Sequence, residues 1–175
     1  MSDGKPRFWL NLFTGGTWEA FRSEGMQTCG FTRNWRRICG SIEPGDYFLC
    51  YLTGVMRWVG ILEVIRGSYE GDGPKWTRPS FPLLFEVHTE VAITPETGVP
   101  LAFLEGKVDF FLKPEDRKGY KQFFRRCPNL FKRAEDATFI CNLIREAKEN
   151  PILRPVTSSL LNRPPSFKKT YRAGY

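Results

Sequence analysis

The chain has few of the residues from which catalytic and metal centres are usually built. Only one of its 175 residues, His88, is a histidine, and its five cysteines include no Cys-x-x-Cys pair. Structural zinc normally needs paired cysteines or several histidines, so we expect no metal site. His88 has no nearby nucleophile, and the sequence has no phosphate-cradling glycine motif. The sequence therefore predicts neither a catalytic residue nor a cofactor.

Long apolar runs are also absent, and the first ten residues lack the basic and then apolar profile of a secretion signal. This predicts a cytoplasmic protein that does not enter a membrane. An odd number of widely spaced cysteines among apolar neighbours is typical of reduced core residues rather than of a disulfide framework. These residues are Cys29, Cys39, Cys50, Cys127 and Cys141.

Acidic residues are missing from the last part of the chain. The net charge is +7, and residues 150–175 contribute five cations and no acid, which leaves +2 for residues 1–149. The net charge therefore describes the tail more than any site. A length of 175 residues with 41% hydrophobic content suits one core. We predict one domain over residues 1–149, followed by a basic, proline-rich tail over residues 150–175 that is extended or disordered.

The apolar pattern predicts an α+β fold whose strands form a barrel wall. Expected strands cover residues 8–13, 30–31, 46–53, 58–65, 83–93, 108–112 and 129–132. Expected helices cover residues 17–23, 32–41, 101–106, 114–122 and 135–149, with Thr17, Thr32 and Asp136 as caps. Trp9, Trp18 and Trp58 are expected in the core. The glycine- and proline-rich loop 67–80 carries Trp76 and is long enough to predict a role in binding.

The stretch 30–64 joins a cationic, aromatic turn to a hairpin. Arg33, Asn34, Trp35, Arg36 and Arg37 precede the turn 43–46 and two apolar strands. A barrel with such a mouth suits a nucleotide, because aromatic rings stack on bases while arginine holds phosphates. Arg125 and Arg126 form a second basic group. The alternative is that both groups are solvated faces of short helices, and only their placement on one face would favour function.

Five motifs in order resemble EVE-domain proteins, and in particular their small uncharacterised prokaryotic branch. They are FWLNLFTGGTWEAF, GFTRNW, PGDYFLCYLTGVMRWVGILEV, then Tyr69 with Asp72 and Trp76, and FFRRCPNLF before residues 135–136. EVE domains belong to the PUA-like superfamily together with the YTH readers of methylated adenine. The resemblance covers residues 7–148 and implies a twisted mixed β-barrel of five to six strands with short flanking helices. It also implies a pocket for one flipped, modified base.

The resemblance places residues of this chain around such a base. It implies that Trp76 stacks on one side, that Gly30, Phe31 and Thr32 lie opposite, and that Asn11 at the end of the first strand reads the base edge. The alternatives are that Trp76 attaches its own loop to the barrel and that Asn11 satisfies backbone groups at a strand end. Thr53 stands where many EVE domains have serine. The YTH pattern has a tryptophan near residues 31–32, whereas this chain has none until Trp35. Trp35 therefore either completes the pocket or plugs the barrel mouth, and which ring opposes Trp76 stays open.

The preferred hypothesis is a non-enzymatic module that holds a modified base of DNA or RNA, with an effector protein on a separate chain. Phosphates would be held by Arg33, Arg36, Arg37, Arg125 and Arg126, which position a strand without reading its sequence. One alternative is a protein-interaction domain whose basic tail docks an acidic partner. Another is an enzyme that processes nucleic acids or small amides, which the missing catalytic groups disfavour.

Overall fold

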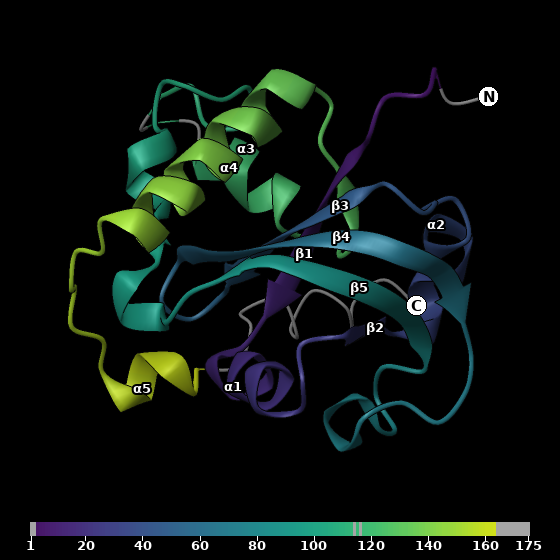
Figure 1. The fold of residues 1–175 in the computed structure, drawn as a ribbon. Coiled ribbons are helices and arrows are strands. Elements are labelled where there is room, and N and C mark those ends of the chain that lie inside the picture. The colour runs from purple at the N-terminus through teal and green to yellow at the C-terminus, as the bar shows by residue number, and fades with distance from the viewer. Residues whose placement is uncertain (1–2, 114, 116, 164–175) are drawn as a thin grey trace.

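The fold is built on one curled, mixed sheet (Figure 1). The computed structural model describes residues 3–113, 115 and 117–163, and in this part of the chain seven strands pair in the order β2-β5-β4-β3-β1-β7, with β6 on β4. The strands are β1 (Phe8–Phe13), β2 (Thr28–Phe31), β3 (Tyr47–Leu52), β4 (Arg57–Tyr69), β5 (Leu83–Ala92), β6 (Val99–Pro100) and β7 (Asn129–Leu130). The predicted fold class is confirmed. The sheet has seven strands where the resemblance implies five to six; β6 was not predicted, and β7 is the first half of the strand predicted at 129–132.

Short helices surround the sheet, with α4 on one side and α1 on the other (Figure 1). They are α1 (Gly15–Ser23), α2 (Arg36–Cys39), α3 (Arg117–Phe123), α4 (Ala134–Glu149) and α5 (Ser158–Leu161), with 3-10 turns η1 (Arg33–Trp35), η2 (Lys75–Thr77), η3 (Pro95–Thr97) and η4 (Leu101–Leu104). No helix among the described residues has the length and apolarity needed to cross a membrane.

The order of the strands brings the end of β1 next to the end of β3. These two strands are parallel, from Phe8 opposite Tyr47 to Phe13 opposite Leu52, because α1, β2, η1 and α2 lie between them in the chain. The turn at 53–56 then returns the chain antiparallel along β4, as predicted. Register shifts in the β4–β5 ladder interrupt regular pairing, as bulges do, and bulges bend a sheet.

Helix α1 packs on the sheet through Trp18, which is fully buried. The indole donates a hydrogen bond from Nε1 to the carbonyl of Ile93 at 3.0 Å. Gly60 in β4 makes room for the ring, since a Cβ at that position would lie 2.7 Å from Trp18 Cη2. The helix begins earlier than predicted because Thr14, not Thr17, is the cap, and the two threonines form a reciprocal capping box. Trp9 and Trp58 are buried as predicted.

Two other predicted elements differ from the structure. Residues 108–112 form turns with one bridge between Val108 and Phe111, not a strand. Helix α4 begins at Ala134, and Asp136 lies in its first turn rather than at its cap. The buried Asp136 carboxylate accepts a hydrogen bond from the backbone N–H of Asp109 at 3.0 Å. The apolar stripe of α4 is core as predicted, with Ile140 and Ile144 fully buried.

Asp109 and Asp136 give the fold a testable pH dependence. Burial raises the pKa of Asp109, the nearby Asp136 carboxyl raises it further, and Lys132 and Arg133 oppose the shift. Because the pKa is higher in the folded protein than in the unfolded chain, the protonated carboxyl makes its full contribution to stability below about pH 3.9. That contribution is lost as the pH rises through the folded-state pKa. Asp109→Asn should therefore raise the melting temperature at pH 7 by roughly 1–3 °C.

The gain from Asp109→Asn should disappear near pH 3, where the wild-type carboxyl is also uncharged. Thermal unfolding followed by circular dichroism at both pH values checks this. Asp72→Asn is the control, because Asp72 is exposed and no ion pair or hydrogen bond of its carboxylate is present among the described residues. An equal gain at pH 3 and pH 7 would contradict the electrostatic explanation.

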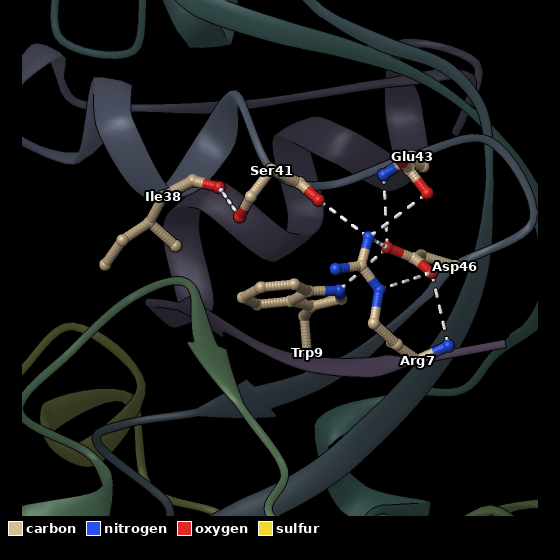
Figure 2. A network of polar contacts seen from close by, with 6 residues as sticks. All are labelled: Arg7, Trp9, Ile38, Ser41, Glu43 and Asp46. Atoms are coloured by element: carbon tan, nitrogen blue, oxygen red, sulfur yellow. Dashed lines mark hydrogen bonds and ion pairs between the residues drawn. The ribbon is translucent and has the colours of Figure 1, made fainter. Parts of the chain in front are cut away.

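A polar network fixes the start of β1 to the turn before β3 (Figure 2). Asp46 is 4% exposed, and its carboxylate accepts hydrogen bonds from Arg7 Nη2 at 2.8 Å and Trp9 Nε1 at 3.0 Å. It also accepts from the backbone N–H of Arg7 and of Glu43. Arg7 continues the network to the carbonyl of Ser41 at 2.6 Å. The buried Asp46 carboxylate therefore joins the start of β1, residues 41–43 and the turn before β3. It also accepts the hydrogen bond of the indole N–H of the core residue Trp9.

The described part of the C-terminal tail lies on the domain. Arg57 Nη1 donates to the carbonyl of Arg154 at 2.7 Å, and the Arg154 guanidinium lies 5.0 Å from the centre of the Phe103 ring. Residues 151–157 have no regular secondary structure, as predicted, but α5 follows, which was not. The backbone of α5 approaches Gly54 so closely that an added Cβ would lie 2.0 Å from the carbonyl oxygen of Leu160. Lys168, Lys169 and Arg172 lie outside the described residues.

Candidate functional site

A pocket of about 390 Å³ opens where β1, β2 and β3 end. Thr53 follows β3 and donates its backbone N–H to the carbonyl of Phe13 at 3.0 Å, which holds this turn beside the end of β1. Six of the residues predicted for the site line the pocket: Gly30, Phe31, Thr32, Trp35, Thr53 and Arg125. The pocket has the size of known small-molecule sites, which start at about 300 Å³.

Aromatic rings make up much of the wall. Trp35 lies in η1 and is half-buried, as is Phe81, whereas Phe13, Phe31 and Phe124 are buried and line the pocket from the core side. Phe31 packs edge-on against Phe85 at 5.6 Å between ring centres, which fixes the end of β2. Trp35 therefore forms part of the pocket wall.

Trp76, predicted as the ring that faces a ligand, is not among the residues that line the pocket. It packs instead on Phe13, Phe21 and Phe81, with ring centres 5.8–6.0 Å apart. Two of these phenyl rings, Phe13 and Phe81, line the pocket, so Trp76 supports the wall from behind. An exposed-looking aromatic in a glycine-rich loop is in this case the residue that attaches the loop to the core.

Asn11, predicted to read a base edge, lies behind the wall as well. It is 2% exposed, and its Oδ1 lies 4.0 Å from Cys127 Sγ. Cys127 and Leu12 line the pocket, and the backbone N–H of Leu12 donates to that sulfur at 3.2 Å. The Nδ2 of Asn11 has no hydrogen-bond partner among the described residues. A buried amide donor therefore lies directly behind the pocket floor.

Sequence reasoning missed several lining residues. Phe81 lies between the predicted loop 67–80 and the predicted strand 83–93, and Phe124 and Cys127 flank the arginines at residues 125–126. Burial raises the pKa of the Cys127 thiol to about 12. The thiol therefore stays protonated at neutral pH and is a poor nucleophile. Arg125 is the charged residue among the lining residues.

No family model matches this chain, and no curated protein matches it. Solved structures do. The Mmi1 YTH domain in complex with RNA matches with a TM-score of 0.60 and 12% identity over 87% of this chain and 85% of that one. The fold is that of the YTH domains, a PUA-like half-barrel. The YTH domain of Zygosaccharomyces rouxii MRB1 in complex with N6-methyladenosine RNA matches at 0.58 and 16%, over 82% of this chain and 88% of that one.

Small bacterial proteins share this YTH-like fold. Atu2648 from Agrobacterium tumefaciens matches with a TM-score of 0.55 and 17% identity, over 86% of this chain and 99% of that one. At such identities the likeness shows the fold alone. In the described part of this chain, no three histidine, cysteine or acidic side chains are arranged to hold a metal ion.

The predicted arginines have different surroundings. Arg33 and Arg36 both pair with the Glu70 carboxylate, and Arg37 is exposed with no ion pair among the described residues. Arg125 lines the pocket and donates to Gln122 at 2.9 Å. Arg126 instead lines a separate groove together with Phe123 and Lys132, which we call the α3 groove. The two consecutive arginines therefore line different hollows, and the phosphate contact predicted for Arg126 stays a prediction.

Proposed function

We propose that this protein is a non-enzymatic module that binds one flipped, modified base of a single nucleic acid strand. The base lies in the aromatic pocket at the ends of β1, β2 and β3, which we call the Trp35 pocket. One observation carries the proposal: an aromatic pocket with the volume of a ligand site lies between Arg125 and the turn that carries Arg33, Arg36 and Arg37. Neighbours of the same fold support it, since the Mmi1 YTH domain was solved with RNA and the MRB1 YTH domain with N6-methyladenosine RNA.

The energetics of base flipping fit a pocket of this kind. Taking a base out of its stack costs a few kcal/mol, and each aromatic contact returns about 1–3 kcal/mol. Trp35 and Phe81 are the half-buried rings on which a base would stack. The polar lining groups, Thr14, Thr17, Thr32, Asn34 and Thr53, offer hydrogen bonds to its edge. We assign Arg37 and Arg125 to the flanking phosphates, which fix the strand without reading sequence.

We also propose that the chain belongs with the EVE domains, acts in the cytoplasm, and passes its signal to an effector protein on another chain. The order of the five motifs and the small bacterial neighbours of the same fold support the first assignment. The protonated Cys127 thiol supports a binding rather than a catalytic role for the pocket.

The direct test is fluorescence anisotropy with a labelled ten-nucleotide strand that contains one N6-methyladenosine, its unmethylated twin, and DNA versions of both. We expect binding to RNA with about a fourfold preference for the methylated strand, because a buried methyl group contributes about 0.8 kcal/mol. Strands with other modified bases extend the series. Failure of every strand to bind at 50 mM salt would overturn the proposal.

Arg37→Ala should weaken the binding of all strands by a similar factor and lower the salt dependence. Each phosphate contact contributes about 0.7 to the slope of log K against log salt for a single strand, so the slope should become shallower by about that amount. Arg126→Ala is the matched control, since Arg126 is an equally exposed arginine that lines the α3 groove instead. A larger effect from Arg126 than from Arg37 would place the strand elsewhere.

A further inference from the structure

Glu70 pairs with Arg33 and Arg36, which flank the pocket residues Asn34 and Trp35 in the chain. It follows β4 and begins the loop that leads to Phe81. Its Oε1 accepts a hydrogen bond from Arg36 Nη2 and lies 3.9 Å from Arg33 Nε. The side chains of Arg33, Arg36 and Glu70 are 70%, 63% and 42% exposed, so a ligand in solution can reach all three.

The arginine pair flanks two residues of the pocket wall. Arg33 and Arg36 belong to the turn that contains Asn34 and Trp35, both of which line the pocket. A carboxylate and a phosphate present similar oxygens to a guanidinium group, and arginine binds both. In this structure the position between the two guanidinium groups is held by a side chain of the protein itself.

We propose that Glu70 competes with phosphate for Arg33 and Arg36 and thereby sets the affinity of the site for the nucleic acid backbone, an inference that rests on the proposed function. A strand must displace the carboxylate before its phosphate can reach the pair, and the displaced carboxylate then repels that phosphate. The competition lowers backbone affinity for every strand alike. A strand whose base does not fill the Trp35 pocket is consequently held too weakly to stay bound.

An exposed ion pair is weak in water and screened by salt. Displacement is therefore achievable for a strand that also gains stacking in the pocket, and the competition should act most strongly at low ionic strength. If Glu70 instead only fastens η1 to the loop after β4, its removal should lower the melting temperature and leave affinity unchanged.

Glu70→Gln tests this inference by anisotropy with the same methylated and unmethylated RNA strands. At 50 mM salt the variant should bind both strands roughly three- to tenfold more tightly than wild type, with an unchanged ratio between them. The gain should shrink at 500 mM salt. In an Arg33→Ala, Arg36→Ala background the same substitution should change affinity by much less.

Glu86→Gln is the matched control. Glu86 is 47% exposed and pairs with Arg66, so this variant adds the same charge to the protein away from the pocket lining. If Glu86→Gln gives an equal gain in affinity, the gain comes from the change in net charge alone, and the inference is overturned. Wild-type binding with no gain in Glu70→Gln overturns the role of Glu70 alone. If neither protein binds any strand, the proposed function and this inference fail together.

Discussion

Asp46→Ala should lower the free energy of unfolding by about 3–5 kcal/mol, which makes it the most destabilising of the substitutions considered. Removing one partner of a buried ion pair costs about this much, because the remaining charge and the remaining donors lose their compensation. Asp46 is the shared acceptor for Arg7, Trp9 and the backbone of Glu43. The indole N–H of Trp9 is buried, and without Asp46 it loses its acceptor.

Urea unfolding of wild type and variant measures the effect, and in a protein of this size the melting temperature should fall by roughly 10 °C. Asp72→Ala is the control, because Asp72 lies exposed in the loop after β4 and should cost less than about 0.5 kcal/mol. Equal losses in both variants would mean that the network in Figure 2 contributes no more to the free energy of unfolding than an exposed carboxylate does.

The Asp46 network also shows where sequence reasoning ends. The turn at residues 43–46 and the hairpin that follows it were predicted correctly, since turn chemistry and apolar runs are local signals. The burial of Asp46 was not predicted, because its partners Arg7 and Trp9 precede it by 39 and 37 residues. The parallel pairing of β1 with β3 brings them together, and no local pattern announces that pairing.

The residues of the pocket also fall into those whose position was predicted and those whose position depends on tertiary contacts. Gly30, Phe31, Thr32 and Thr53 line the pocket together, and it was the resemblance to EVE domains that grouped them. Local sequence could not decide between a ligand-facing and a loop-attaching Trp76, because its contacts with Phe13 and Phe21 depend on how α1 and β1 meet the loop 67–80. Arg125 and Arg126 are adjacent in the chain, yet they line different hollows, since successive side chains in a turn need not share a face.

Trp35→Ala should reduce the affinity for methylated and unmethylated strands by roughly 10- to 100-fold, because one stacked base contributes about 1–3 kcal/mol. The melting temperature should change little, as Trp35 is half-buried in a short 3-10 turn at the pocket wall. The anisotropy assay and thermal unfolding measure the two quantities on the same samples.

Trp76→Ala is the matched control, and it should show the opposite combination. Its ring supports Phe13, Phe21 and Phe81 from behind, so its loss should cost stability, about 2 kcal/mol for a half-buried ring against the 3–5 kcal/mol of a fully buried one. Binding should survive wherever the folded state persists. If Trp76→Ala instead abolishes binding while Trp35→Ala leaves it intact, a base is held on the other side of Phe13 and the assignment of the pocket is wrong.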